Sequence, residues 1–149
     1  MLKGIDPLLG PDLLHALRSM GHGDTLALVD ANYPADAQAR RTPHGATIRL
    51  DGHDLGRVAT AILSVLPLDD FTEDFALRMA PDDTPDLLSE PQNELAAALR
   101  AAGESRPMQA IARHRFYEAA ARAYAIVQTG ERRLYGCALL QKGVIRPDG

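Results

Sequence analysis

The chain has 149 residues, of which 46% are hydrophobic, and a formal net charge of -4. This length suits one domain with a buried core, so we expect residues 1–149 to form a single domain. The 16 Lys and Arg residues are scattered rather than gathered in a basic stripe, which argues against nucleic-acid binding. The lone Cys137 excludes an internal disulfide. Because no signal peptide or membrane-spanning apolar run is visible, we expect a cytoplasmic protein without membrane contact.

Hydrophobic spacing and turn residues predict the secondary structure along the chain. Leucines at helical spacing predict a helix over residues 11–20, which Gly21 ends. The continuous apolar run at residues 25–29 predicts a strand that is buried on both faces. The same criteria predict further strands at 47–50, 75–79, 108–112, 125–127 and 135–140, helices at 55–66, 92–102 and 116–123, a loop at 35–45 and a charged corner at 113–115.

This alternation of helices with short buried strands predicts an α/β fold. A strand buried on both faces needs helices above and below it, which is typical of a parallel or mixed sheet between two helical layers. We therefore expect a three-layer αβα domain. In such sheets, binding sites form outside the carboxyl ends of the strands.

His22 is the first candidate for a chemical role. It lies between Gly21 and Gly23, and these glycines leave both sides of the imidazole free of side chains, so a ligand can approach it closely. Histidine both gives and takes a proton near neutral pH. The pattern therefore favours an acid–base group at the start of the strand at 25–29.

Two further candidates lie where predicted strands end. Asp30 follows the strand at 25–29 and is succeeded by Asn32 and Tyr33, so it suits either ligand binding or capping of the next turn. Arg113 follows the strand at 108–112, and its guanidinium fork suits ligand oxygens. The alternative for Arg113 is an ion pair with a surface carboxylate.

Five separated motifs follow one another along nearly the whole chain. They are Met20-Gly21-His22-Gly23-Asp24, Asp30-Ala31-Asn32-Tyr33-Pro34, Ile48-Arg49-Leu50-Asp51-Gly52, Phe116-Tyr117-Glu118 and Thr129-Gly130-Glu131-Arg132-Arg133-Leu134-Tyr135-Gly136. In order and spacing they resemble the RbsD/FucU family, which contains the L-fucose mutarotases and the D-ribose pyranases. Arg113 stands where the mutarotases carry arginine and the pyranases histidine, so the mutarotase branch is the more similar one.

The resemblance implies an RbsD-like fold and a role for each candidate. His22 matches the catalytic histidine, whereas Asp30, Arg113 and the pair Tyr135-Gly136 match sugar-binding residues. Cys137 stands where the family has the asparagine of a Tyr-Gly-Asn triplet. A thiol is a weak donor, and losing one hydrogen bond to a sugar hydroxyl costs on the order of 1 kcal/mol, so the sugar preference is open.

The implied reaction is the interconversion of the α and β anomers of a reducing monosaccharide. Because it consists of proton transfers around ring opening and closure, it needs no cofactor or metal ion. Two alternatives stay open beside the D-ribose pyranase activity. One is a zinc or iron enzyme that uses Asp30 and several histidines, namely His15, His22, His44, His53 and His114. The other is a non-catalytic sugar-binding protein linked to sugar transport.

The spacing of His22 and Asp30 raises a geometric question. Eight residues in an extended chain span up to about 26 Å, which is too far for both side chains to reach one monosaccharide. Either the flanking turns fold toward each other, or two subunits share the site. The resemblance implies the second arrangement, a homo-oligomeric ring, commonly a decamer of two pentamers, with a sugar pocket between neighbouring subunits.

Overall fold

The computed structural model describes residues 1–147. Its helices are α1 (Pro11–Ser19), α2 (Ala35–Ala39), α3 (Leu55–Leu63), α4 (Glu90–Ala101) and α5 (Arg113–Ala120), with a 3-10 turn, η1, at Glu73–Phe75. Its strands are β1 (Thr25–Val29), β2 (Thr47–Leu50), β3 (Ala76–Met79), β4 (Gln109–Ile111), β5 (Ala125–Thr129) and β6 (Ala138–Gln141).

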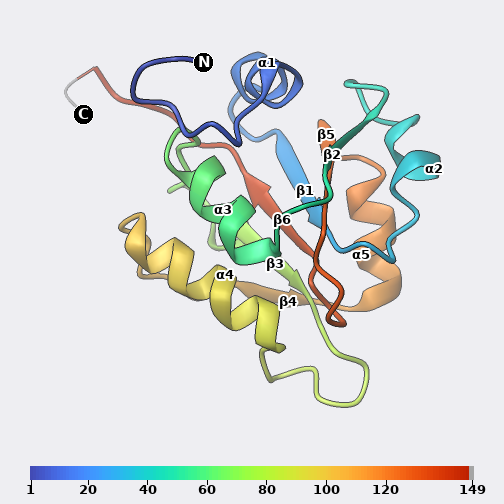
Figure 1. The fold of residues 1–149 in the computed structure, drawn as a ribbon. Coiled ribbons are helices and arrows are strands. Elements are labelled where there is room, and N and C mark those ends of the chain that lie inside the picture. The colour runs from blue at the N-terminus through green and yellow to red at the C-terminus, as the bar shows by residue number, and fades with distance from the viewer. Residues whose placement is uncertain (148–149) are drawn as a thin grey trace.

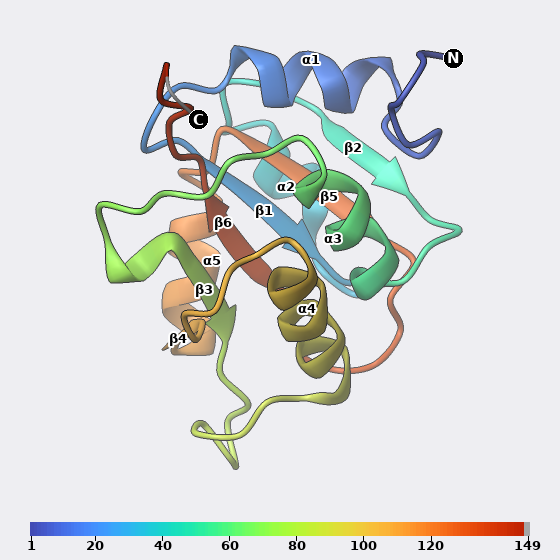
Figure 2. The same cartoon turned by 90° about the vertical axis from the view of Figure 1, so that its left-hand side faces the viewer.

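The six strands form one mixed sheet in the order β2-β5-β1-β6-β3-β4 (Figure 2). β1 and β2 both pair in parallel with β5, and β3 pairs in parallel with β4. β6 lies between β1 and β3 and is antiparallel to both. Five strands therefore share one direction, and β6 alone is reversed.

Helices cover both faces of this sheet, as the αβα prediction requires. α1, α3 and α4 lie over one face, and α2 and α5 lie over the other (Figure 1). Each face has its own apolar core, represented by Leu26, Phe75 and Leu140 on the first and by Ile126 and Phe116 on the second. Burial on both faces explains why the strands carry continuous apolar runs rather than alternating ones.

Local signals fix several element boundaries. Pro11 occupies the first turn of α1, where a missing N–H costs nothing. The Asp54 carboxylate caps α3 by accepting the backbone N–H of Arg57 at 2.8 Å. No helix within residues 1–147 is both long and apolar enough to cross a bilayer.

Three local predictions were wrong, and the helices predicted at 55–66 and 116–123 end earlier, at Leu63 and Ala120. Residues 35–45 were expected to be a loop, but Ala35–Ala39 form α2, which packs its two buried alanines on the sheet. The expected corner at 113–115 is the first turn of α5. The last strand begins at Ala138 rather than at residue 135, because Tyr135 has a φ of +59° and leaves extended geometry.

Candidate sugar-binding site

The carboxyl edge of the sheet gathers four of the predicted site residues around one hollow. Asp30 follows β1 and Arg113 follows β4, and these two strands run in the same direction. Because β6 runs the other way, Tyr135 and Cys137 reach the same edge just before its first residue. The hollow has a volume of about 280 Å³, near the lower end of the roughly 300–1,000 Å³ typical of small-molecule sites.

Asp30 forms the buried polar floor of the hollow. Its side chain receives the backbone N–H of Asn32 at 3.0 Å on one oxygen and the Cys137 thiol at 3.4 Å on the other. Burial nevertheless raises the pKa of Asp30 above its usual range, because desolvation outweighs these hydrogen bonds. A carboxylate with a raised pKa is a stronger base than an ordinary surface aspartate.

Cys137 is a neutral, buried partner of Asp30. Its side chain is almost completely buried, and burial raises the pKa of the thiol well above the usual value, with the nearby Asp30 charge acting in the same direction. The thiol is therefore protonated at neutral pH, which fits a hydrogen-bond donor rather than a nucleophile.

Tyr135 is held in an uncommon backbone conformation. Its φ of +59° is a left-handed value that a bulky residue rarely adopts. The Tyr135 carbonyl accepts the side-chain amide of Gln92 at 2.8 Å, and the same amide nitrogen also binds the Met79 carbonyl at 2.7 Å. Because Gln92 is completely buried near the start of α4, it ties the Tyr135 turn to the end of β3.

Gly136 is required by close packing. A Cβ atom at this position would lie 2.6 Å from the Glu131 Cγ and 3.4 Å from the Asp30 Cβ. Glycine therefore lets the chain between Tyr135 and Cys137 pass directly over Asp30.

Arg113 lies at the rim of the hollow with Asp82. Its Nε donates to the Asp82 carboxylate at 2.8 Å, and both side chains are about half exposed, at 52% and 51%. The Tyr135 hydroxyl accepts the Asp82 backbone N–H at 3.2 Å. Arg113 thus forms the surface ion pair weighed from the sequence, and it also lines the ligand-sized hollow.

His22 lies at the opposite edge of the sheet. Its side chain is 47% exposed, and its Nε2 lies 3.1 Å from the carboxylate of Asp69, which is buried. Asp69 is held in turn by the Phe71 backbone N–H at 2.9 Å and the Gln141 side-chain amide at 2.9 Å. These hydrogen bonds, the Phe71 one foremost, lower the pKa of Asp69 below its usual value and keep it ionised.

One chain therefore does not bring His22 and Asp30 together. They lie at opposite ends of β1, whose five residues span about 16 Å at roughly 3.3 Å per residue. The flanking turns do not close this gap, because Gly23 bonds to Lys142 and Ala31 bonds to Glu131 at their separate edges.

Three residues with polar side chains at these two edges were not singled out from the sequence, namely Asp69, Asp82 and Tyr117. Asp69 is 47 residues from His22 and carries no local motif. Asp82 lies in an acidic loop, which by itself favours a solvated side chain. Tyr117 stacks on Tyr33 in the hollow with ring centroids 5.1 Å apart. Tyr33 was noted from the sequence as a polar neighbour of Asp30, whereas the sequence signal for Tyr117 is its place within one of the five motifs.

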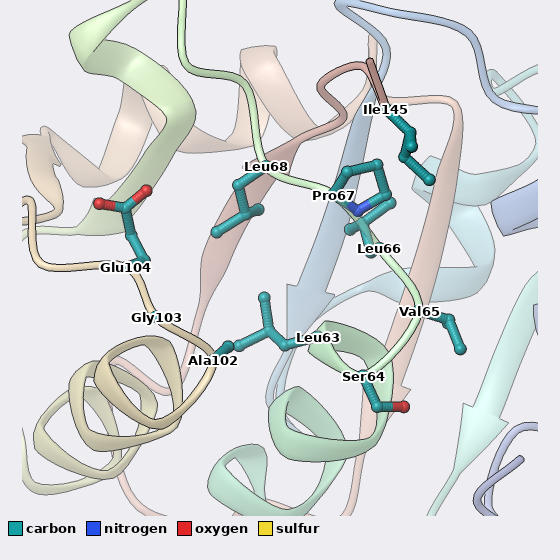
Figure 3. Close-up of a pocket in the computed structure, with 10 residues that line it drawn as sticks. All are labelled: Leu63, Ser64, Val65, Leu66, Pro67, Leu68, Ala102, Gly103, Glu104 and Ile145. Atoms are coloured by element: carbon teal, nitrogen blue, oxygen red, sulfur yellow. The ribbon is translucent and has the colours of Figure 1, made fainter. Parts of the chain in front are cut away.

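A second hollow of about 340 Å³ lies where α3 and α4 end (Figure 3). Most of the residues that line it have aliphatic side chains, and the Glu104 carboxylate is already bound by Arg106 at 2.7 Å. This arrangement offers no acid–base pair. Among residues 1–147, no three His, Cys, Asp or Glu side chains are grouped as a metal site.

Comparison with known proteins places these features in a family. The profile of the RbsD / FucU transport protein family matches residues 3–145. Fucose mutarotase of Homo sapiens is 42% identical over 147 residues, 97% of this chain and 94% of that protein. The crystal structure of fucose mutarotase from Streptococcus pneumoniae in complex with L-fucose has a TM-score of 0.87 at 34% identity, over 97% of this chain and 100% of that one.

A more distant relative has the same fold. Bacillus subtilis RbsD, whose structure is complexed with D-ribose, is 19% identical and has a TM-score of 0.71, with 98% of this chain and 100% of that one covered. The fold of this chain is thus shared with both solved structures. As its five spaced motifs predict, the chain belongs to the RbsD/FucU family.

Proposed function

We propose that this protein is a mutarotase, a cofactor-independent isomerase that interconverts the α and β anomers of a reducing monosaccharide, with L-fucose as its substrate. The observation that carries the proposal is the hollow at the carboxyl edge, where the buried Asp30 faces Arg113 and Tyr135. Family relatives named fucose mutarotase support the choice of sugar. We also propose that residues 1–149 form a single domain and that the protein is cytoplasmic.

The reaction needs two proton transfers. A base takes the proton of the anomeric hydroxyl, the C1–O5 bond breaks as the C1 carbonyl forms, and the ring oxygen O5 receives a proton. Rotation about C1–C2 and the reverse steps then give the other anomer. General acid–base groups placed at these atoms contribute typically 10²- to 10⁴-fold to such a rate.

Each candidate residue has a proposed role. His22 exchanges the proton at the anomeric end, and the ionised Asp69 orients its ring by accepting from Nε2. Asp30 binds sugar hydroxyls, and its raised pKa suits it to share a proton with them. Arg113 and Tyr135 hold further sugar oxygens at the rim, while Gly136 and Cys137 shape the floor around Asp30.

We further propose that two subunits form each site, in a ring of the decameric kind that the family resemblance implies. The His22 edge of one copy then closes the Asp30 hollow of its neighbour. Exposed apolar side chains support such a contact, because Phe71, 66% exposed, packs beside His22 and Leu134, 70% exposed, stands at the hollow.

Anomer-exchange NMR of L-fucose tests the reaction directly. The wild-type protein is expected to accelerate exchange, and His22→Ala is expected to abolish the acceleration. His15→Ala is the matched control, because this imidazole is exposed on α1 and does not line the Asp30 hollow. Wild-type protein that binds L-fucose without accelerating exchange supports a sugar-binding protein instead, and acceleration with D-ribose but not L-fucose supports a pyranase.

Co-expression of two inactive variants tests the shared site. When His22→Ala and Asp30→Asn chains assemble at random in equal amounts, about one quarter of the sites combine two native edges and regain activity. If His22 and Asp30 act within one chain, mixing restores nothing. Light scattering of the wild type gives the number of subunits, and a fully active monomer contradicts the proposal.

A further inference from the structure

The buried hydroxyl group of Tyr33 makes no hydrogen bond within residues 1–147. The residue is 5% exposed, and the atom without a partner is its Oη. Leaving a buried polar group unpaired costs a folded protein stability. Phenylalanine packs the same ring without that cost, so ring packing alone does not account for the hydroxyl.

The Tyr33 ring is held firmly in place. It stacks on Tyr117 with an interplanar angle of 9° and meets the edge of Phe116 at 85°. The backbone is fixed as well, because the Tyr33 N–H donates to the Asp30 carbonyl at 3.2 Å and the Tyr33 carbonyl accepts the Gln128 amide at 3.1 Å. The hydroxyl is therefore positioned by its neighbours without bonding to them.

The ligand-sized hollow is the space that adjoins this side chain; the hydroxyl oxygen itself is covered, so a sugar reaches it once a neighbouring side chain shifts. Tyr33 lines the hollow together with Asp30 and Cys137. Burial raises the pKa of Tyr33, so the phenol stays protonated and remains a donor at neutral pH. Cys137 offers no comparable contact, because its thiol is a weak donor already directed at the Asp30 carboxylate at 3.4 Å.

We propose that the Tyr33 hydroxyl is a specificity-determining group that binds a hydroxyl of the sugar in the Asp30 hollow and supplies the strong polar contact that Cys137 lacks. This inference rests on the proposed function, because it assigns one more contact to the same sugar site. The pair Tyr33 and Cys137 then sets which sugar hydroxyl this chain recognises.

Tyr33→Phe tests the assignment by titration with L-fucose and with its monodeoxy analogues. Loss of one neutral hydrogen bond is expected to raise the Kd for L-fucose about threefold to tenfold. For the analogue that lacks the contacted hydroxyl, variant and wild type are expected to bind equally. The melting temperature is expected to stay the same or rise, because the hydroxyl removed has no partner among the described residues 1–147.

Two further variants make the result specific. Tyr124→Phe, a half-buried tyrosine packed in the other core cluster, is expected to leave the Kd unchanged. Adding Cys137→Asn to Tyr33→Phe returns a strong donor to the hollow and is expected to recover part of the lost affinity. If Tyr33→Phe binds L-fucose with the wild-type Kd, the inference about Tyr33 is wrong. The proposed function still holds in that case, provided that the wild type accelerates anomer exchange. A wild type that binds no sugar overturns both.

Discussion

Glu131 is a buried carboxylate that supports the chain leading into the sugar-binding edge. Its side chain is 3% exposed and accepts three N–H groups of Arg133, at 2.8 Å from Nε, 2.7 Å from Nη2 and 2.9 Å from the backbone. Arg133 also pairs with Glu94 at 2.7 Å. Glu131→Gln keeps the shape of this side chain but removes its charge, which leaves Arg133 donors facing an amide.

The structure sets the size of the effect. The hydrogen bonds from Arg133 lower the pKa of Glu131 from 4.5 to about 2. At about 1.4 kcal/mol per pKa unit this corresponds to roughly 3 kcal/mol, the lower end of the 3–5 kcal/mol lost when a buried ion pair is broken. Because the folded-state pKa is lowered, this stabilisation is complete above pH 4.5 and disappears as pH falls toward 2.

Urea unfolding followed by circular dichroism measures this prediction, with protein concentration held constant because assembly also stabilises the fold. At pH 7, Glu131→Gln is expected to lower the free energy of unfolding by roughly 3 kcal/mol, and the difference from wild type is expected to shrink between pH 4.5 and 2. Glu94→Gln is the control, because this carboxylate binds the same arginine but is 40% exposed. A Glu131→Gln loss no larger than the Glu94→Gln loss refutes the reasoning.

Two substitutions test the two edges separately. Gly136→Ala places a Cβ 2.6 Å from the Glu131 Cγ. This overpacking is expected to lower the free energy of unfolding in urea by about 1–3 kcal/mol and to weaken sugar binding. Asp69→Asn removes the charge that lies 3.1 Å from His22 Nε2. A charge-assisted hydrogen bond is worth about 1.5–3 kcal/mol, so its loss is expected to lower kcat tenfold or more, as measured by anomer-exchange NMR.

A matched substitution of the same kind serves as the control for each variant. Gly52→Ala adds a Cβ that meets no non-adjacent residue of the described part of the chain within 4 Å, so its free energy of unfolding is expected to stay near that of wild type. Asp70→Asn removes an exposed carboxylate that pairs with Arg146, and its kcat is expected to be unchanged. Equal free energies of unfolding for Gly136→Ala and Gly52→Ala would contradict the close packing proposed at Gly136. Equal kcat values for Asp69→Asn and Asp70→Asn would contradict the role proposed for Asp69.

The sequence by itself determined the features that local forces specify. The apolar period of α1, the buried run of β1 and the Asp54 cap of α3 all act between residues close in the chain, so their positions were predicted correctly. The five spaced motifs identified the family, whereas the roles of His22 and Asp30 stay predictions. Alternation of these elements was enough to predict the αβα layers.

Only the tertiary structure decided how distant segments meet. The reversal of β6 brings Tyr135 to the edge where Asp30 lies, and strand direction is set by pairing across the sheet rather than by the composition of the strand. Asp69 faces His22 across 47 residues, a separation over which no local pattern operates. The unpaired hydroxyl of Tyr33 is likewise a property of its packed surroundings, since a tyrosine in the sequence looks the same whether its oxygen is bonded or free.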